Sequence, residues 1–146
     1  MIEIIENGNL FNSQKQTIVN TINTVGVMGK GLALEFKHKY PDYFKGYKKH
    51  CDNHLVKTGR VYLHKKTTPW ILSFPTKEHW CNPSKIEWIE QGLDYLVANY
   101  KTMGIESLAI PALGCTNGGL NWEEVKPLIV AKLETLPIEI ELYAPR

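Results

Sequence analysis

Apolar residues along the chain recur at two spacings: short runs typical of strands, and a three-to-four-residue repeat typical of helices. The short runs predict strands at Ile2–Ile5, Thr17–Ile22, Arg60–His64, Trp70–Phe74, Ser107–Pro111 and Ile138–Tyr143. The helical repeat predicts helices at Lys30–Tyr40, at Asp42–Cys51, from Ser84 to Gly104 and from Asn121 to Leu133. Strands interleaved with helices indicate an α/β domain with a mixed, largely parallel sheet.

Local signals predict where two of the helices begin. Ser84 with Glu87, and Asn121 with Glu124, have the spacing of a capping box, in which two side chains satisfy free backbone groups at a helix start. Gly104 is a typical stop for the first of these helices.

A glycine-dense segment follows the second predicted strand and leads into a helix. Its glycines are Gly26, Gly29 and Gly31, a spacing that matches neither the dinucleotide fingerprint nor the P-loop. Glycines let the backbone approach a ligand, and free N–H groups at a helix start attract phosphate. The segment is therefore a phosphate cradle or an ordinary surface connection. Asn20 and Asn23 favour the cradle, since amides near the strand's exit can bind sugar hydroxyls.

A second glycine-rich loop, Gly114–Gly119, follows the predicted strand Ser107–Pro111. In open α/β sheets ligands bind beyond the carboxyl ends of the strands. Both loops are therefore expected at one edge of the sheet, as two backbone clamps that suit an extended diphosphate.

Composition is consistent with one domain of 146 residues and a net charge of +2. Residues 30–66 carry ten Lys or Arg against three acidic residues, and residues 67–146 carry six against ten. The basic part is a flank for nucleic-acid phosphates or a solvated helical face. Three cysteines, no long apolar run and no signal-peptide layout predict a protein of the reducing cytoplasm.

Metal ligation and thiol chemistry find little support in the residue spacing. His50, Cys51, His54, His79 and Cys81 match no zinc-binding spacing, so no metal is expected. Cys115 lies in the second loop, but no motif places a histidine to activate it as a nucleophile.

Three motifs together resemble a known family: VNTINTVGVMGKGLALEFK, FPTKEHW and IPALGCTNGGLNW. They are similar to those of macrodomains, and more narrowly of the DarG-type ADP-ribosyl-DNA glycohydrolases, antitoxins that remove ADP-ribose from thymidine bases in DNA. The resemblance extends from Asn9 to Tyr143. It implies a single macrodomain over residues 1–146, folded as a three-layer α/β/α sandwich.

The resemblance also implies the ligand site. Asn9 would hold the adenine amino group in place of the aspartate that many macrodomains have there, and Tyr143 would lie against the adenine face. Asn20 and Asn23 would face the distal ribose and the linked base. The remaining ADP-ribose-binding residues belong to the two loops and their flanks: Leu10, Val27, Met28, Gly29, Lys30, Gly31, Thr76, Gly114, Cys115, Thr116, Asn117, Gly118, Gly119 and Leu120.

Lys77 would be the catalytic residue, with Asn23 beside it, because the family's essential lysine stands in the same FPTK context. Related protein-directed enzymes also use an acidic residue in the second loop, which is absent from GCTNGGL here. A lysine partly removed from water can attack the anomeric carbon as a neutral amine or, if charged, stabilise the departing base. Trp80, beside Lys77, could touch the substrate base.

The expected function is therefore removal of ADP-ribose from DNA bases, without a cofactor, by a cytoplasmic monomer. The implied partners are ADP-ribose, ADP-ribosylated DNA and a cognate ADP-ribosyltransferase toxin, with no membrane. Three alternatives stay open: hydrolysis of ADP-ribose from acidic protein side chains, deacetylation of O-acetyl-ADP-ribose, and a module that only binds ADP-ribose.

Overall fold

The computed structural model describes residues 1–146, and its strands and helices alternate as the apolar pattern predicts. Its strands are β1 (Ile2–Ile5), β2 (Thr17–Asn23), β3 (Tyr62–His64), β4 (Trp70–Lys77), β5 (Ser107–Ile110) and β6 (Glu139–Tyr143). Its helices are α1 (Gly31–Lys39), α2 (Pro41–Asp52), α3 (Ile86–Met103) and α4 (Trp122–Leu133), with one short 3-10 turn, η1 (Leu10–Asn12). The largest departure among the strands is β4, which continues past Phe74 to Lys77.

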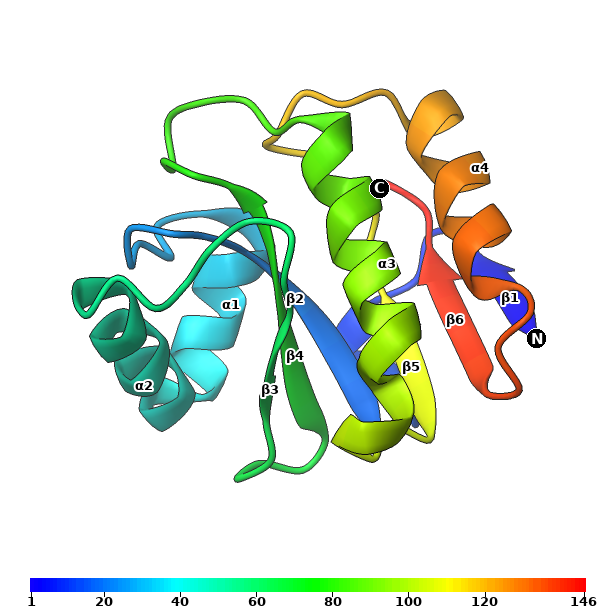
Figure 1. The fold of residues 1–146 in the computed structure, drawn as a ribbon, viewed down its shortest axis with the longest axis horizontal. Coiled ribbons are helices and arrows are strands. Elements are labelled where there is room, and N and C mark those ends of the chain that lie inside the picture. The colour runs from blue at the N-terminus through cyan, green and yellow to red at the C-terminus, as the bar shows by residue number, and fades with distance from the viewer.

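The six strands form one sheet in the order β1-β6-β5-β2-β4-β3. Every neighbouring pair is parallel except β3 and β4, which are antiparallel. The predicted mixed, largely parallel sheet is therefore confirmed. Because β5, β2 and β4 are neighbours and point the same way, the segments that follow them leave the sheet at the same edge (Figure 1).

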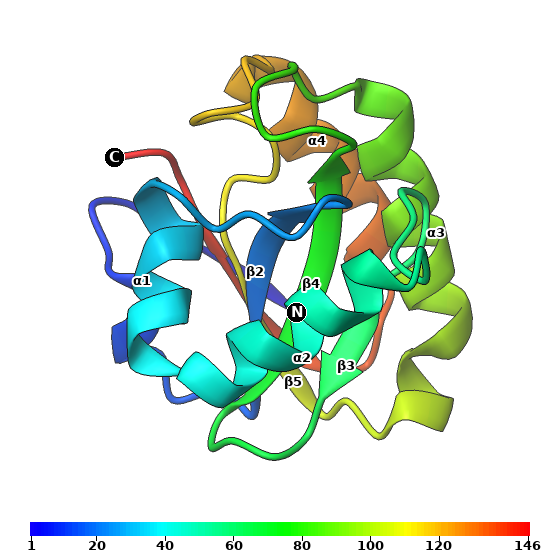
Figure 2. The same ribbon diagram turned by 90° about the vertical axis from the view of Figure 1, so that its left-hand side faces the viewer.

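Helices cover both faces of this sheet, which confirms the three-layer arrangement. α1 and α2 lie on one face, and α3 and α4 on the other (Figures 1 and 2). Alternating side chains of each strand enter the two cores, as the pleat requires. On β4, Ile71 packs in the core under α1 and α2, while its neighbour Leu72 packs in the core under α3 and α4. None of the helices is both long and apolar enough to cross a membrane.

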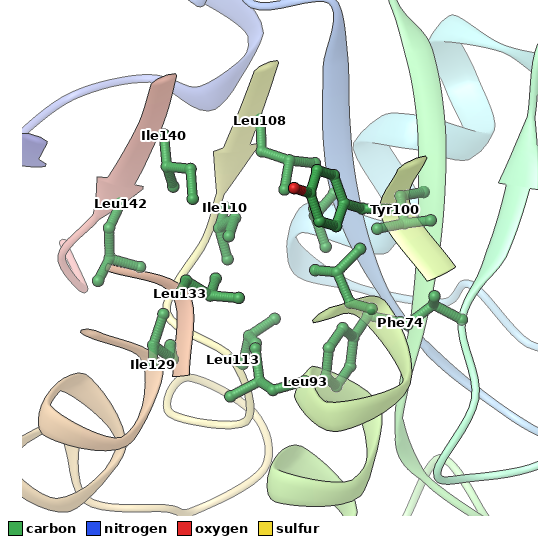
Figure 3. Packing of buried hydrophobic residues seen from close by; sticks show 14 of the residues in the cluster. Phe74, Leu93, Tyr100, Leu108, Ile110, Leu113, Ile129, Leu133, Ile140 and Leu142 are labelled. Atoms are coloured by element: carbon green, nitrogen blue, oxygen red, sulfur yellow. The ribbon is translucent and has the colours of Figure 1, made fainter. Parts of the chain in front are cut away.

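The larger core lies between the sheet and the helices α3 and α4 (Figure 3). Phe74 and Leu108 from the strands meet Leu93 from α3 and Ile129 from α4, and all four side chains are almost fully buried. At about 25 cal/mol per Å² of apolar surface, burial of these large side chains supplies most of the stabilisation that holds α3 and α4 on the sheet.

Of the three predicted helix boundary signals, the stop at Gly104 and the cap at Asn121 are confirmed, while the Glu124 half of the capping box at Asn121 makes no hydrogen bond to the Asn121 N–H. Gly104 ends α3 in the left-handed conformation, with φ of 81°, and the side chain of Asn121 accepts a hydrogen bond from the N–H of Glu123 at the start of α4. The capping box at Ser84 is wrong. α3 begins at Ile86 after Lys85, which makes no side-chain cap, and Ser84 is buried with its N–H donated to the carbonyl of Gly118. Pairing with the second glycine-rich loop holds Ser84 away from the helix start.

Gly92 permits the close approach of α3 to the sheet. A Cβ atom at this position would collide with the ring of Phe74, which is buried and cannot move aside. We therefore expect Gly92→Ala to lower the free energy of unfolding by about 1–3 kcal/mol, as overpacking of a filled core does. Denaturant titration measures this change.

Gly46 provides the matched control for that substitution. It lies on the exposed face of α2, and a Cβ atom there would meet nothing within 4 Å. Gly46→Ala should stabilise the protein by roughly 0.5–1 kcal/mol, through helix propensity alone. Equal effects of the two substitutions would contradict close packing at Gly92.

Candidate functional site

A cavity of about 380 Å³ opens at the sheet edge where β2, β4 and β5 end. Two segments enclose it: loop 1 (residues 24–30), which follows β2, and loop 2 (residues 111–121), which follows β5. The expectation that both glycine-rich loops lie at one edge is therefore confirmed. The residues that line the cavity are Thr21, Ile22, Asn23, Val27, Gly29, Lys30, Leu32, Ala33, Thr76, Lys77, Trp80, Pro111, Ala112, Gly114, Thr116, Asn117 and Gly118.

An irregularity in the pairing of β2 and β4 brings the two predicted catalytic residues together. Ile22 pairs with Pro75, but Asn23 pairs with Lys77, so β4 carries one extra residue, Thr76. Bulges of this kind bend a strand and redirect the side chains that follow. Asn23 and Lys77 consequently lie opposite one another at the floor of the cavity.

Asn23 organises loop 1 through both ends of its side-chain amide. Its Oδ1 accepts hydrogen bonds from the N–H groups of Val25 and Val27, at 3.1 and 3.3 Å, and its Nδ2 donates to the carbonyl of Val27 at 2.7 Å. These bonds fold the loop back on itself. In this structure the amide of Asn23 therefore has a positioning role, holding loop 1 over the cavity.

Tyr47 of α2 supports Asn23 from behind. Its hydroxyl lies 2.8 Å from both the backbone carbonyl and the Oδ1 of Asn23. Burial raises the pKa of Tyr47 well above its usual range, so the hydroxyl stays protonated and remains a donor. A side chain of α2 thereby supports loop 1, which leads into α1.

The start of α1 faces the cavity. Lys30 occupies the N-cap position without a side-chain hydrogen bond, and Lys30, Leu32 and Ala33 all line the cavity. The first N–H groups of a helix have no partner within the helix, and the helix dipole adds positive potential there. This end of α1 can therefore bind an anion.

Loop 2 depends on a glycine where it packs against the segment before α3. A side chain at Gly118 would collide with the hydroxyl of Ser84 and the carbonyl of Gly114. The two loops also approach each other, since a Cβ atom at Gly31 would lie 2.8 Å from Nδ2 of Asn117. Glycine at these positions therefore permits the close packing of loop 2 against Ser84 and against the start of α1.

Lys77 projects its amine between β4 and loop 2. Its Nζ donates hydrogen bonds to the carbonyl of Asn117 at 2.8 Å and to that of Trp80 at 3.2 Å. Partial burial and the neighbouring charge of Lys30 lower the pKa of Lys77, against a smaller opposing effect of Cys81. Lys77 and Lys30 are the charged residues of the lining, which holds no carboxylate.

Eleven of the residues predicted from sequence line the cavity, and they come from both loops, from the ends of β2 and β4 and from the turn after β4. These are Asn23, Val27, Gly29, Lys30, Thr76, Lys77, Trp80, Gly114, Thr116, Asn117 and Gly118. The others lie outside the lining: Asn9, Leu10, Asn20, Met28, Gly31, Cys115, Gly119, Leu120 and Tyr143.

Asn20 is the clearest departure from the expected arrangement. It is fully buried beneath the cavity, where its Nδ2 donates to the hydroxyl of Tyr43 at 3.1 Å and lies 3.8 Å from the sulfur of Met28. Tyr43 in turn hydrogen-bonds Ser73 of β4. In this structure Asn20 therefore packs α2 against the sheet and does not face the cavity.

The two residues predicted to hold adenine lie near each other but away from the cavity. A side chain at Gly8, which precedes Asn9, would collide with the ring of Tyr143. Asn9 caps η1 by accepting from the N–H of Phe11 at 3.0 Å, and Tyr143 is buried and donates to Glu141. Their contacts to a ligand remain predictions.

Sequence reasoning missed apolar and small residues of the lining. Thr21 and Ile22 precede the predicted loop, Leu32 and Ala33 form the first turn of α1, and Pro111 and Ala112 precede loop 2. These residues could have been predicted from their place in the sequence. A residue that directly precedes or follows a ligand-binding loop, on the strand or helix that the loop joins, lies at the same edge of the sheet as the loop.

Replacement of Tyr47 by phenylalanine tests the support of loop 1. The one O–H of Tyr47, shared between the carbonyl and Oδ1 of Asn23, disappears, so we expect a loss of about 1 kcal/mol in unfolding free energy. The amides of Val25 and Val27, held by Asn23, should exchange with solvent faster. Hydrogen exchange followed by NMR measures this effect residue by residue.

Tyr62→Phe is the matched control, because its hydroxyl also makes hydrogen bonds, to Leu55 and Lys57, outside loop 1. It should leave exchange at Val25 and Val27 unchanged. Unchanged exchange in Tyr47→Phe itself would show that loop 1 does not depend on α2.

Comparison with known proteins relates this geometry to a family. The Macro domain family model matches residues 19–129. A DNA ADP-ribosyl glycohydrolase of Thermus aquaticus is 43% identical over 94% of this chain, which covers 40% of that relative. The solved macrodomain of Thermus aquaticus DarG aligns with a TM-score of 0.93 and 42% identity over 99% of both chains.

Thermosipho africanus DarTG in complex with ADP-ribose aligns with a TM-score of 0.94 and 42% identity, over 99% of this chain and 41% of that one. The chain thus spans less than half the length of the curated relative and of this longer structure. With a family model over most of its length and relatives above 40% identity, the chain belongs to the macrodomain family.

Proposed function

We propose that this macrodomain hydrolyses the bond between ADP-ribose and a thymidine base of DNA, and so reverses the action of a toxin-like transferase. The observation that carries the proposal is the amine of Lys77, held by the carbonyl groups of Asn117 in loop 2 and of Trp80 in the turn after β4, in a cavity without carboxylates. The Thermus aquaticus relative named as a DNA ADP-ribosyl glycohydrolase supports the choice of DNA.

Binding of the diphosphate would use the start of α1 and the two loops. The free N–H groups at Gly31 and after it, the dipole of α1 and the charge of Lys30 all favour an anion at the same place. Loop 2, which lines the cavity with Gly114, Thr116, Asn117 and Gly118, would supply further backbone N–H groups. The solved Thermosipho africanus DarTG complex supports ADP-ribose as this ligand.

Lys77 would act at the sugar that these loops present. Its two hydrogen bonds, to Asn117 and Trp80, leave one position on the nitrogen free to face the ligand. In the neutral amine that position is a lone pair, which can form a bond to the anomeric carbon as the base departs. In the protonated amine it is a third N–H, which can stabilise the leaving base.

The absence of a carboxylate in the lining favours a mechanism centred on the lysine. Loop 2 offers Thr116 and Asn117 as its polar side chains at the cavity, and neither can act as a general base at neutral pH. Asn23 is bound to loop 1 and Tyr47, so it positions the site rather than exchanging protons. Lys77 is left as the titratable group with both the position and the perturbed pKa for chemistry.

The proposal extends to location and partners. We propose that the protein acts in the cytoplasm, where a DNA substrate is accessible and where the free cysteines Cys51, Cys81 and Cys115 are stable as thiols. We propose that the protein acts as a monomer, alongside the cognate transferase whose product it removes. The relation to Thermosipho africanus DarTG supports this pairing.

The principal test offers the purified protein three substrates: a thymidine-ADP-ribosylated oligonucleotide, a glutamate-ADP-ribosylated protein and O-acetyl-ADP-ribose. The oligonucleotide should be hydrolysed, and Lys77→Ala should reduce that rate by roughly 10³-fold or more, the scale of losing a principal stabilising group. Calorimetry should find binding of free ADP-ribose largely intact in the variant.

Lys85→Ala is the control for that substitution, because Lys85 follows on the same segment but lies over the ring of Trp88, outside the cavity lining. Undiminished hydrolysis by Lys77→Ala would remove this residue from the mechanism. Preference for the modified protein or for O-acetyl-ADP-ribose would overturn DNA as the substrate.

The charge of Lys30 provides a pH test. Lys30 lowers the pKa of Lys77, so Lys30→Gln should raise that pKa and move the corresponding limb of the pH profile of kcat/KM to higher pH. A shifted acid limb identifies the neutral amine as the active form, and a shifted alkaline limb identifies the protonated amine. Lys30→Arg keeps the charge and should leave the limb in place.

Identical profiles for the glutamine and arginine variants would show that Lys30 does not influence Lys77. The test uses only the pH at which this limb of the kcat/KM profile occurs. The height of the profile is not used, because loss of Lys30 also weakens diphosphate binding and lowers the overall rate.

A further inference from the structure

Large exposed apolar side chains concentrate beside the cavity. Outside Met1 and Leu55, the side chains of this kind are Val25, Val27 and Trp80, which are 43%, 38% and 50% exposed. Val27 and Trp80 line the cavity itself, and Val25 lies on the same loop as Val27. Exposed apolar clusters of this kind mark binding surfaces.

The two segments that carry these side chains are bound to each other. The N–H and the hydroxyl of Thr24 both donate to the carbonyl of Glu78, at 3.1 and 2.8 Å. The start of loop 1 therefore lies against the start of the turn that follows β4. We refer to Val25, Val27 and Trp80 together as the apolar rim.

Contacts within the turn after β4 hold the segment that carries Trp80. The ring of His79 lies 5.5 Å from that of Trp80 at an angle of 33°. Its Nδ1 accepts from the N–H of Cys81 at 3.3 Å, and its carbonyl accepts from the N–H of Asn82 at 3.1 Å. A flat aromatic surface is thus fixed in an exposed position, where it has no partner from the protein core.

The position of Trp80 relative to Lys77 indicates what this surface contacts. The amine of Lys77 is 3.2 Å from the carbonyl of Trp80, so the bond on which Lys77 acts lies next to this residue. Under the proposed function, ADP-ribose would fill the cavity on one side of that bond. The group on its other side, which departs in the reaction, would then lie at the apolar rim.

We infer that the apolar rim holds the modified nucleobase, with the indole of Trp80 stacked on its face. This inference rests on the proposed function and adds to it the residue that recognises the leaving group. Enzymes that act on a base in DNA must hold it out of the base stack, and aromatic stacking is the usual means. The carboxylate of a modified glutamate would gain nothing from this apolar surface.

Replacement of Trp80 tests the inference on the intact protein. With the thymidine-modified oligonucleotide, Trp80→Ala should lower kcat/KM by roughly 5- to 150-fold, the effect of losing one stacked base. Trp80→Phe keeps an aromatic face and should recover most of the rate. Binding of free ADP-ribose, which lacks the base, should be unchanged in both variants by calorimetry.

Trp88→Ala is the matched control, since Trp88 lies on α3 outside the cavity lining. It should retain the wild-type rate. Wild-type turnover by Trp80→Ala would overturn the stacking role and leave the proposed function standing. Loss of ADP-ribose binding in Trp80→Ala, or no recovery in Trp80→Phe, would also count against stacking, whereas failure of the wild-type protein on the modified oligonucleotide would overturn the proposed function itself.

Discussion

The parallel pairing of β2 with β4 on one side and β5 on the other is the constraint on which the site depends. Three segments distant in sequence leave the sheet at one edge because these three strands are neighbours and point the same way. Loop 1, Lys77 and loop 2 are the direct continuations of the three strands. An antiparallel β4 would carry Lys77 to the opposite edge, about the length of the strand away from the loops.

Polar contacts of a few side chains hold loop 1 and the turn after β4 in place at this edge of the sheet. Tyr47 fixes Asn23, Asn23 folds loop 1, and Thr24 of loop 1 holds the carbonyl of Glu78 in the turn after β4. Each contact joins one segment to the next. The core under α2, to which Tyr47 belongs, is in this way connected to the segment that carries the exposed Trp80.

The fold was largely predictable because apolar spacing reports which faces are buried. The strands at Ile2–Ile5 and around Ser107 were found from short apolar runs, and the end of α3 from Gly104. Ser84 shows where such reasoning fails: its spacing to Glu87 is that of a capping box, but a backbone bond to Gly118, distant in sequence, places it elsewhere.

Long-range packing also explains which features of the site could not be read from sequence. Asn20 and Asn23 are three residues apart on one strand and look equivalent. Side chains alternate between the two faces of the strand, and the bulge beyond Ile22 changes the direction of those that follow. The amide of Asn20 therefore lies under α2, and the amide of Asn23 bonds to loop 1. The family resemblance named Lys77, but the carbonyl groups that hold its amine come from the turn after β4 and from loop 2, which only the folded chain brings together.

The carbonyl groups around Lys77 come from two different sides of the cavity. Asn117 belongs to a loop that encloses the cavity, while Trp80 belongs to the apolar rim, where the proposed reaction would release its leaving group. The amine is therefore positioned by backbone atoms of the two segments that would contact the two halves of the substrate. Because backbone atoms set this position, the side chains at both segments can vary in sequence and alter specificity while the nitrogen stays in place.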